Sequence, residues 1–282
     1  MKKKYYILIL LFIAYVVFAQ SCMRMRISDK EAKQAFDSSH ISLETATIKI
    51  DGKDFHYVHT GNDSLPRIVF IHGSPGSWDA YKAFLRDTTL LNHFSMYAID
   101  RFGFGYSNFG KAEPLNVHTN GIISFIRKIA NNKPIYLVGH SYGGPCVVDI
   151  ASNYPNEIAG ITVLAGSVSP YLENPEKWRL VFMFAPIAPL VPGALKPSNI
   201  ELWMLKNDLK RLEPQIKNLS CKVLIIHGNK DRLVPYANMK YMEEKMVNAK
   251  EVKTITINEA DHFIPWSHYQ IVMPAILDFF KK

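Results

Sequence analysis

The sequence predicts an α/β fold with a mainly parallel sheet that helices cover on both faces. Three apolar runs have the composition of buried strands, namely Arg67–Ile71, Pro134–Val138 and Val223–Gly228. Three segments of helical periodicity lie between the strands, at 78–91, 116–130 and 236–247. Strands that alternate with helices favour parallel pairing, because each helix carries the chain back to the starting edge of the sheet.

Size and charge narrow the class of protein. The chain has 282 residues, of which 48% are hydrophobic, and this suits one full-sized domain with a substantial core. Lys and Arg number 33 against 25 Asp and Glu, and three of these lysines are Lys2–Lys4, so the remainder carries 30 − 25 = +5. No dense block of Lys and Arg with interleaved aromatics occurs. Nucleic-acid binding is therefore not expected.

The first 21 residues are predicted to be a signal peptide. Lys2–Lys4 form a charged start, and Tyr5 to Ala19 is an apolar run of the length expected for a signal core. This run is short for a membrane-spanning helix, which needs about 20 residues.

The residues at the end of this run indicate how the protein is anchored to a membrane. Ala19-Gln20-Ser21-Cys22 resembles the lipobox of bacterial lipoproteins, although that motif prefers leucine at the Ala19 position and a small residue at the Gln20 position. The resemblance implies that Cys22 is lipidated and that an exported bacterial protein is anchored to a membrane, facing the periplasm or cell surface. Soluble export and an uncleaved anchor are the alternatives.

The remaining chain divides into a tether and a domain. Residues 22–40 are polar and irregular enough for a tether, and 41–282 form the predicted domain. The domain begins with two strands over 43–60, joined at Asp51-Gly52-Lys53.

A nucleophile is predicted at Ser141. The pentapeptide Gly-His-Ser-Tyr-Gly at 139–143 follows a strand and opens a helix-like segment that runs to Asn153. A sharp strand-to-helix turn exposes its central serine, and the glycines allow the backbones to pass closely. A simple turn serine is the alternative.

A serine nucleophile needs a base and an acid that orients the base. Asp231 and His262 each follow a later strand, and only His262 among the ten histidines lies in a loop that enters the last helix. Asp231 in a turn-like sequence could instead only shape that turn. Asp100 is a competing acid, but it precedes the nucleophile and its neighbours suit a structural turn.

The order Ser141, Asp231, His262 resembles that of serine hydrolases with the alpha/beta-hydrolase fold. Two upstream motifs support the resemblance: His-Gly-Ser-Pro-Gly-Ser at 72–77 is similar to the family's oxyanion loop, and 100–107 to its D-R-x-G-x-G-x-S turn. The resemblance implies an eight-stranded, mainly parallel sheet with a short cap after strand 6. It also implies that the backbone N–H groups of Ser74 and Tyr142 hold the oxyanion.

The predicted cap covers about residues 167–220. Structureless loops of that length are uncommon unless they act as lids. The apolar run Trp178–Pro192 is suited to line an acyl pocket, to rest against a membrane, or to pack the cap onto the domain.

These features predict a serine hydrolase that cleaves an ester-type bond through an acyl-enzyme, without a metal or organic cofactor. Cys146 and Cys221 are expected to be buried, and no Cys/His spacing suits zinc.

Relatives that hydrolyse epoxides use an aspartate where this chain has Ser141. A prolyl aminopeptidase-like peptidase is the first alternative, and it would use acidic cap side chains to grip a substrate amine: Glu173, Glu176 and Glu201. A non-catalytic binding protein is the second alternative. The sequence leaves the oligomeric state open.

Overall fold

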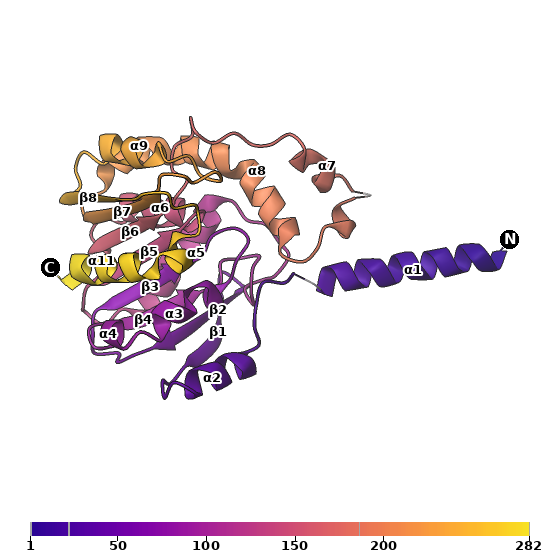
Figure 1. Cartoon of the computed structure of the whole chain (residues 1–282), viewed down its shortest axis with the longest axis horizontal. Helices are drawn as coiled ribbons and strands as arrows, with labels where there is room; N and C mark the ends of the chain where they lie inside the picture. The colour runs from indigo at the N-terminus through magenta and orange to yellow at the C-terminus, as the bar shows by residue number, and fades with distance from the viewer. Residues whose placement is uncertain (1, 22, 186, 282) are drawn as a thin grey trace.

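A single eight-stranded sheet organises the molecule (Figure 1). The computed structural model describes residues 2–21, 23–185 and 187–281. Within these residues the strand order is β1-β2-β4-β3-β5-β6-β7-β8. The strands are β1 Glu44–Ile50, β2 Lys53–Thr60, β3 Arg67–Ile71, β4 Ser95–Ile99, β5 Ile135–His140, β6 Gly160–Leu164, β7 Lys222–Gly228 and β8 Glu251–Ile257. All pairs from β4 to β8 are parallel.

The antiparallel strands β1 and β2 form the predicted hairpin. Asp51 and Gly52 connect them with φ values of 49° and 75°. Two successive residues with positive φ are what a type I′ hairpin turn requires, and Asp-Gly is a favoured pair for it. The hairpin extends the sheet through β2, which pairs with β4 in antiparallel fashion.

Helices cover both faces of the sheet. They are α3 Lys82–Leu85, α4 Thr88–Leu91, α5 Leu115–Ile129, α6 Gly143–Asn153, α9 Asn238–Lys245, α10 Ile264–Ser267 and α11 Tyr269–Lys281. Side chains of β3 alternate between the two cores: Val69 packs with α5 and α6, and Phe70 with α3, α4 and α11. The predicted layered α/β architecture is therefore confirmed.

The single helix expected over 78–91 is broken into three short pieces. A 3-10 turn, η1 Trp78–Tyr81, runs into α3, and Asp87 then starts α4. The Asp87 carboxylate accepts hydrogen bonds from the backbone of Thr89 and Leu90, so it acts as an N-cap in the middle of the apparent period.

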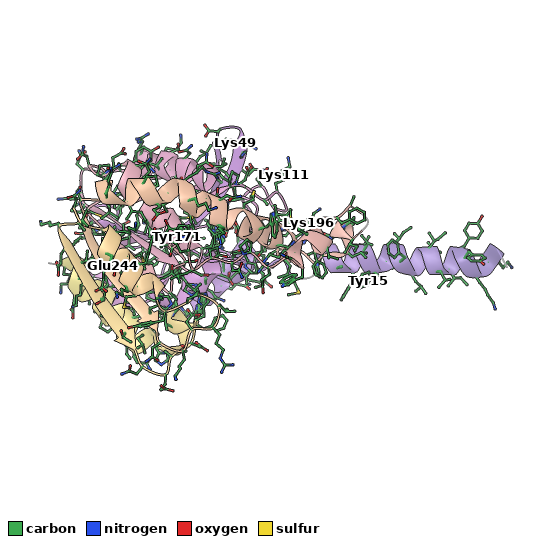
Figure 2. The ribbon with its side chains drawn as sticks, turned by 90° about the horizontal axis from the view of Figure 1, so that it is seen from above. Tyr15, Lys49, Lys111, Tyr171, Lys196 and Glu244 are labelled. Atoms are coloured by element: carbon green, nitrogen blue, oxygen red, sulfur yellow. The ribbon has the colours of Figure 1, made fainter. Side chains whose placement is uncertain are left out.

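The segment before the domain contains two helices. Helix α1, Lys2–Ser21, extends away from the rest of the protein, whereas α2, Asp29–Asp37, packs on it (Figures 1 and 2). Ser28 and Glu31 form a capping box, and Ala32 and Phe36 are buried in the core, so the expected irregular tether over 22–40 is partly a docked helix.

Helix α1 coincides with the predicted signal peptide. Among the described residues it alone is long and apolar enough to cross a membrane, over Lys3–Ser21, and a signal sequence near the N-terminus meets the same criterion. Its 20 residues span about 30 Å at 1.5 Å per residue. The predicted lipidation site, Cys22, lies outside the described residues.

The cap lies between β6 and β7, as expected. It comprises α7 Arg179–Met183, η2 Ala188–Leu190, α8 Leu195–Leu212 and η3 Glu213–Asn218. Helix α8 contacts α5 and η3, and it buries Leu205, Leu209 and Leu212 in the core. Helix α7, in contrast, has no buried residue.

Candidate active site

Ser141 lies at the sharp turn between β5 and α6. Its φ of 55° is in the left-handed region, which a non-glycine residue occupies only at a backbone cost. The turn is held because Ser141 N donates to Leu164 O at 3.0 Å and Gly144 N donates to Ser141 O at 2.9 Å. Ser141 is half-buried and occupies a strained strand-to-helix turn, the backbone geometry that the motif predicted.

The glycines around Ser141 are required by close backbone contacts. A Cβ on Gly139 would lie 2.1 Å from Gly143 O, and one on Gly143 would lie 2.2 Å from Ile71 O. A Cβ on Gly73, in the loop after β3, would lie 2.9 Å from Ser141 Cβ. The 72–77 loop therefore passes directly against the serine, and only a residue without a side chain fits there.

Asp231 and His262 come together from loops after β7 and β8. His262 Nδ1 lies 2.7 Å from Asp231 Oδ2, and this fixes the ring with Nε2 as the nitrogen left for other chemistry. The other carboxylate oxygen accepts hydrogen bonds from the backbone of Leu233 and Val234, both at 2.8 Å. Asp231 thus shapes its turn and also contacts His262, so its role is not confined to the turn.

A second histidine, which the sequence analysis did not identify, contacts Asp231. His227 Nε2 lies 3.2 Å from Asp231 Oδ2 and 3.1 Å from Val234 O. Burial alone would raise the pKa of Asp231, but the hydrogen bonds from His227 and His262 outweigh it and hold that pKa well below its ordinary value. The carboxylate is therefore ionised throughout the neutral range.

His140 supports the His262 loop. Its Nε2 lies 3.0 Å from His262 O, and the two rings are 4.8 Å apart. Burial, followed by the neighbouring His262, lowers the pKa of His140 to about 3. A neutral His140 donates this hydrogen bond and adds no positive charge beside His262.

The 100–107 turn is the structural support that its motif indicated. Buried Asp100 accepts hydrogen bonds from Trp78 N at 2.8 Å and from Tyr106 N at 2.9 Å, and it pairs with His56 Nδ1 at 2.8 Å. A Cβ on Gly105 would lie 2.0 Å from the Asp100 carboxylate. Asp100 is fully occupied here and does not compete with Asp231 as the orienting acid.

Arg101 holds the loop that passes Ser141. Its guanidinium donates to His72 O at 3.1 Å and to Gly73 O at 2.9 Å, and its backbone N donates to His72 Nε2 at 3.0 Å. His72 in turn bonds Gly73 O through Nδ1 at 2.7 Å. Together these hydrogen bonds fix the backbone carbonyl groups of His72 and Gly73, beside the serine.

The charge of Arg101 is balanced by Glu201 from cap helix α8. The pair is bidentate, at 2.8 and 2.9 Å, and both side chains are fully buried. Burial would raise the pKa of Glu201, but Arg101 outweighs it and lowers that pKa to about 2. Glu201, considered above as a grip for a substrate amine, is unavailable for that role because it is enclosed and paired.

Ser74 and Tyr142, the predicted oxyanion residues, line the same cavity as Ser141. The Ser74 hydroxyl bonds Ser198 Oγ of α8 at 2.8 Å, which ties this loop to the cap a second time. Tyr142 is the N-cap of α6, and the Arg101 guanidinium lies over its ring at 4.3 Å. A helix N-terminus presents unsatisfied N–H groups and a partial positive charge, which favour a developing anion.

A cavity of about 1060 Å³ joins these parts. Ser141, Asp231 and His262 all line it, together with apolar side chains of the cap and of neighbouring loops: Leu172, Leu202, Leu205, Leu233, Phe263 and Trp266. Met25–Ile27 from the N-terminal segment also line it, which no local signal in the sequence indicated.

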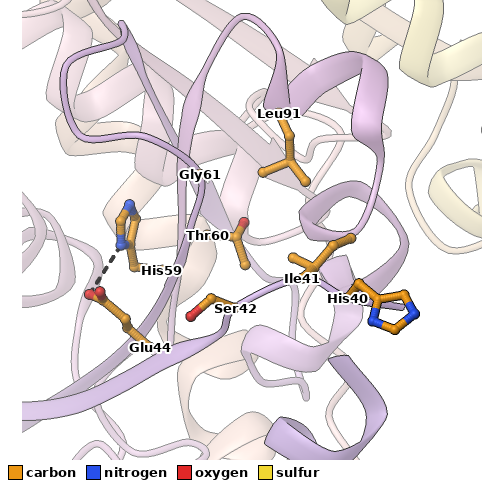
Figure 3. A pocket seen from close by; sticks show the side chains of 8 residues that line it. All are labelled: His40, Ile41, Ser42, Glu44, His59, Thr60, Gly61 and Leu91. Carbon is orange, nitrogen blue, oxygen red and sulfur yellow. Dashed lines mark hydrogen bonds and ion pairs between the residues drawn. The ribbon is translucent and has the colours of Figure 1, made fainter. Parts of the chain in front are cut away.

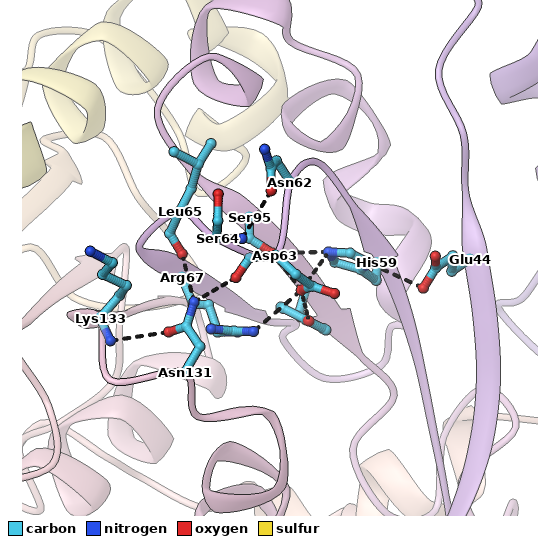
Figure 4. A network of polar contacts seen from close by, with 11 residues as sticks. Glu44, His59, Asn62, Asp63, Ser64, Leu65, Arg67, Ser95, Asn131 and Lys133 are labelled. Atoms are coloured by element: carbon cyan, nitrogen blue, oxygen red, sulfur yellow. Dashed lines mark hydrogen bonds and ion pairs between the residues drawn. The ribbon is translucent and has the colours of Figure 1, made fainter.

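A smaller cavity of about 280 Å³ lies beside β1 and β2, and His59 lines it (Figure 3). Figure 4 shows that His59 belongs to a polar network with Glu44, Asp63 and Ser95. Arg67 pairs with Asp63 in this network, so the loop between β2 and β3 is fixed to the sheet. The network explains local structure, although Arg67 Nε and Nη1 are buried without a hydrogen-bond partner.

Comparison with known proteins agrees with this architecture. The sequence profile of the alpha/beta hydrolase fold matches residues 66–190, a range that includes Ser141 but neither Asp231 nor His262. A solved structure of E-2-(acetamidomethylene)succinate hydrolase aligns with 86% of this chain and all of its own, with a TM-score of 0.67 and 18% identity. The chain has the alpha/beta hydrolase fold. Its eight-stranded, mainly parallel sheet and flanking helices are those the sequence predicted.

Two relatives are similar in sequence. Epoxide hydrolase 1 of Caenorhabditis elegans is 27% identical over 153 residues, which cover 53% of this chain and 35% of that protein. Bifunctional esterase/perhydrolase DCH of Acinetobacter calcoaceticus is 24% identical over 276 residues, covering 82% of this chain and 98% of its own. The chain thus spans about a third of the first relative and nearly all of the second. Together these similarities support a hydrolase.

The two described cysteines, Cys146 and Cys221, are free and buried, as expected. In the described part of the chain, no group of three or more His, Cys, Asp or Glu side chains could hold a metal ion.

Proposed function

We propose that this protein is a serine hydrolase that cleaves a carboxylic ester bond through an acyl-enzyme. The observation that carries the proposal is the 2.7 Å contact between His262 Nδ1 and Asp231, in a cavity that Ser141 also lines. Epoxide hydrolases resemble the chain in sequence, but the serine at 141 favours acyl transfer over their aspartate chemistry.

In the first half-reaction, Ser141 Oγ attacks the ester carbonyl carbon while His262 Nε2 accepts the hydroxyl proton. The carbonyl oxygen becomes an oxyanion, and the backbone N–H groups of Ser74 and Tyr142 are the proposed donors to it. Each such donor is typically worth about 2.7–4 kcal/mol. When the oxyanion collapses, the bond to the alcohol breaks and His262 gives the alcohol its proton.

In the second half-reaction, water attacks the acyl-enzyme while His262 accepts one of its protons. Collapse of the second oxyanion releases the carboxylic acid, and the proton returns to Ser141 Oγ. Asp231 stays ionised in both halves, because its pKa is held low by its two histidine contacts. It stabilises the imidazolium that forms twice per turnover.

Replacement of the nucleophile tests this proposal. Ser141→Ala should lower kcat on a short p-nitrophenyl ester by roughly 10⁶-fold if the three residues act as a unit. Ser167→Ala is the matched control, since Ser167 lines the same cavity but donates to Glu173 at 2.8 Å. A Ser141→Ala protein that keeps a tenth of wild-type activity would eliminate this serine as the nucleophile.

An aminopeptidase-like activity is the second candidate. Glu173 and Glu176 line the cavity, where carboxylates could hold a substrate amine. Glu176 already pairs with Arg179 at 2.7 Å, and burial raises the pKa of Glu173, so the two together offer less negative charge than their number suggests. A higher kcat/KM on proline arylamides than on short acyl esters would favour this candidate.

We also propose that the domain is exported and held at a membrane by its N-terminus. The apolar helix α1 and the lipobox-like residues before Cys22 support this, with Cys22 as the proposed lipidation site. Expression in bacteria fed an alkyne fatty acid should label the wild type but not Cys22→Ala. Labelling of neither protein, with α1 retained in the intact mass, would instead identify α1 as the anchor.

A further inference from the structure

We propose that the exposed apolar turn of the cap is a membrane-contact surface, through which the cavity takes its acyl ester from a lipid bilayer. The surface, named here the cap tip, consists of Trp178, Leu180, Val181, Phe182 and Phe184. The proposal rests on the ester hydrolysis proposed above and adds the source and class of the substrate, a membrane-resident lipid ester.

The cap tip is unusually apolar for a surface in water. Its five large side chains are 41–63% exposed within a stretch of seven residues, and helix α7 buries none of its own residues. Single exposed apolar residues are ordinary on soluble proteins, whereas a contiguous group of them indicates a binding surface. A turn that buries none of its apolar side chains gains stability when something apolar covers it.

The position of the cap tip identifies the bilayer as its partner. Gln20 Nε2, near the end of α1, donates to Pro189 O at 2.7 Å and Val191 O at 3.0 Å, both just after α7 in sequence. Ala194 N donates to Met23 O at 2.9 Å. Figure 1 shows α7 on the side of the domain from which α1 leaves.

This placement holds for either kind of membrane anchor. Large apolar side chains on every side of α1 are exposed, including Tyr5 to Ile13, as expected of a helix that lipid surrounds. If α1 is removed and residue 22 carries lipid, the contact between Met23 and Ala194 still starts the chain beside the cap. In both cases the cap tip meets the membrane that holds the N-terminus. Trp178 with exposed Lys177 beside it also suits the headgroup region.

The same two segments form part of the cavity wall. Arg179 of α7 lines the cavity from the cap, and Met25–Ile27 line it from the N-terminal segment. Arg26 is fixed there, since it donates to Gly105 O at 2.6 Å and lies 4.2 Å over the Tyr106 ring. A lipid that leaves the bilayer at the cap tip therefore has the cavity immediately behind it. The cavity's volume of about 1060 Å³ is at the upper end for small-molecule sites and suits a long acyl chain.

Lipid quenching of tryptophan fluorescence tests the contact without turnover. The Ser141→Ala full chain would be reconstituted in phosphatidylcholine vesicles with and without brominated acyl chains, and compared with Ser141→Ala/Trp178→Phe. We expect bromolipid to quench a component of the emission that disappears with Trp178. Equal quenching of both proteins would overturn the proposal, and so would protection of Trp178 by self-association, seen as a concentration-dependent sedimentation coefficient.

Kinetics in the same vesicles test the substrate source. We expect Leu180→Asp/Phe184→Asp to hydrolyse a long-chain ester embedded in the bilayer at least 10-fold more slowly than wild type, and a short soluble ester within about 2-fold of it. Val247→Asp/Ile271→Asp is the control, because it adds the same charge at exposed apolar sites outside the cap.

The outcomes separate this inference from the proposed function. Equal rates of bilayer ester hydrolysis in the tip variant and wild type would overturn the inference. A wild type that hydrolyses only the soluble ester would overturn it too, and would leave the ester hydrolase proposal intact. A wild type inactive on both esters would contradict the proposed function itself. If the tip variant loses both activities, the quenching result decides, because it needs no turnover.

Discussion

The 72–77 loop and helix α7 both contribute residues to the same cavity, but they are held in opposite ways. The loop is fixed at His72 and Gly73 by the Arg101 guanidinium, and Glu201 balances that charge in full burial. The cap tip buries none of its large side chains, which face outward. The 72–77 loop is therefore fixed by hydrogen bonds to a buried guanidinium, whereas α7, held to α8 where Asn199 Nδ2 donates to Arg179 O at 2.9 Å, leaves its apolar side chains exposed.

The division does not follow the boundary between domain and cap. Glu201 and Ser198 lie on cap helix α8, and they bond to Arg101 and to Ser74 of the 72–77 loop, respectively. Helix α8 thus belongs with the proposed catalytic frame, whereas α7 leaves its apolar side chains exposed. Under the proposed mechanism, transition-state stabilisation requires preorganised donors, and the fixed segments are those that would supply them.

The largest effect on kcat is expected at Asp231. Asp231→Asn should lower kcat by about 10⁴-fold, because an amide no longer selects the required tautomer of His262 or stabilises its charged form. Stopped-flow or steady-state ester hydrolysis measures this directly. Asn229→Asp, in the same loop, is the control, and a loss at Asp231 smaller than about 10-fold would place the orienting acid elsewhere.

Glu201→Gln and Glu157→Gln compare the contributions of a buried and an exposed ion pair to the free energy of unfolding. Leaving Arg101 buried without its anion should cost about 3–5 kcal/mol of unfolding free energy, whereas Glu157→Gln, which breaks an exposed pair with Arg127, should cost about 0–1 kcal/mol. Urea unfolding gives both values. Where Glu201→Gln still folds, kcat should fall more than KM rises, since the oxyanion loop is displaced; an unchanged kcat would separate α8 from the catalytic frame.

Substitutions of two leucines compare how much α8 and α7 contribute to the free energy of unfolding. Leu209→Ala in α8 removes a fully buried side chain and should cost about 2–5 kcal/mol, whereas Leu180→Ala in α7, 47% exposed, should change stability by less than about 0.5 kcal/mol. The measurement is urea unfolding of the two variants in detergent. Similar costs at both positions would contradict the exposed placement of Leu180.

The last prediction is a pH dependence from His140. Its pKa of about 3 in the folded protein is below the ordinary 6.5, so between these pH values the unfolded chain binds more protons than the folded one. Unfolding free energy should therefore fall as the pH is lowered through this window, by up to about 1.4 kcal/mol per pH unit for this group. His140→Gln should remove that share of the slope, and exposed His40→Asn should leave it. An unchanged slope in His140→Gln would show that His140 is protonated when folded.

The sequence predicted those parts of the site that follow strands. Ser141, Asp231 and His262 each come after a strand of one parallel sheet, and the ends of such strands share an edge, so chain order and topology bring the three loops together. The requirement for glycines in the 139–143 turn was also predictable, because it arises from backbone contacts at the turn itself. Local chemistry and a regular topology therefore account for the shared cavity of these three residues, whose catalytic roles stay predictions.

The contacts that the sequence did not indicate are long-range ones. Glu201 meets Arg101 across 100 residues, and nothing near either residue marks the pairing. Met25–Ile27 reach the cavity because α2 docks on the domain, an effect of two buried side chains in a segment that is otherwise polar. The prediction of a single helix over 78–91 was wrong for a different reason. The N-cap at Asp87 starts a new helix within the apolar repeat.

Covalent labelling with a fluorophosphonate, read by intact mass, tests the central claim most directly. Wild type, Ser141→Ala and His262→Ala would be labelled side by side, each with a circular dichroism spectrum to establish folding. An activated Ser141 predicts one adduct on wild type and none on either variant in the same time. No adduct on folded wild type, or an equal adduct on Ser141→Ala, would contradict the assignment of Ser141 as the nucleophile of this cavity.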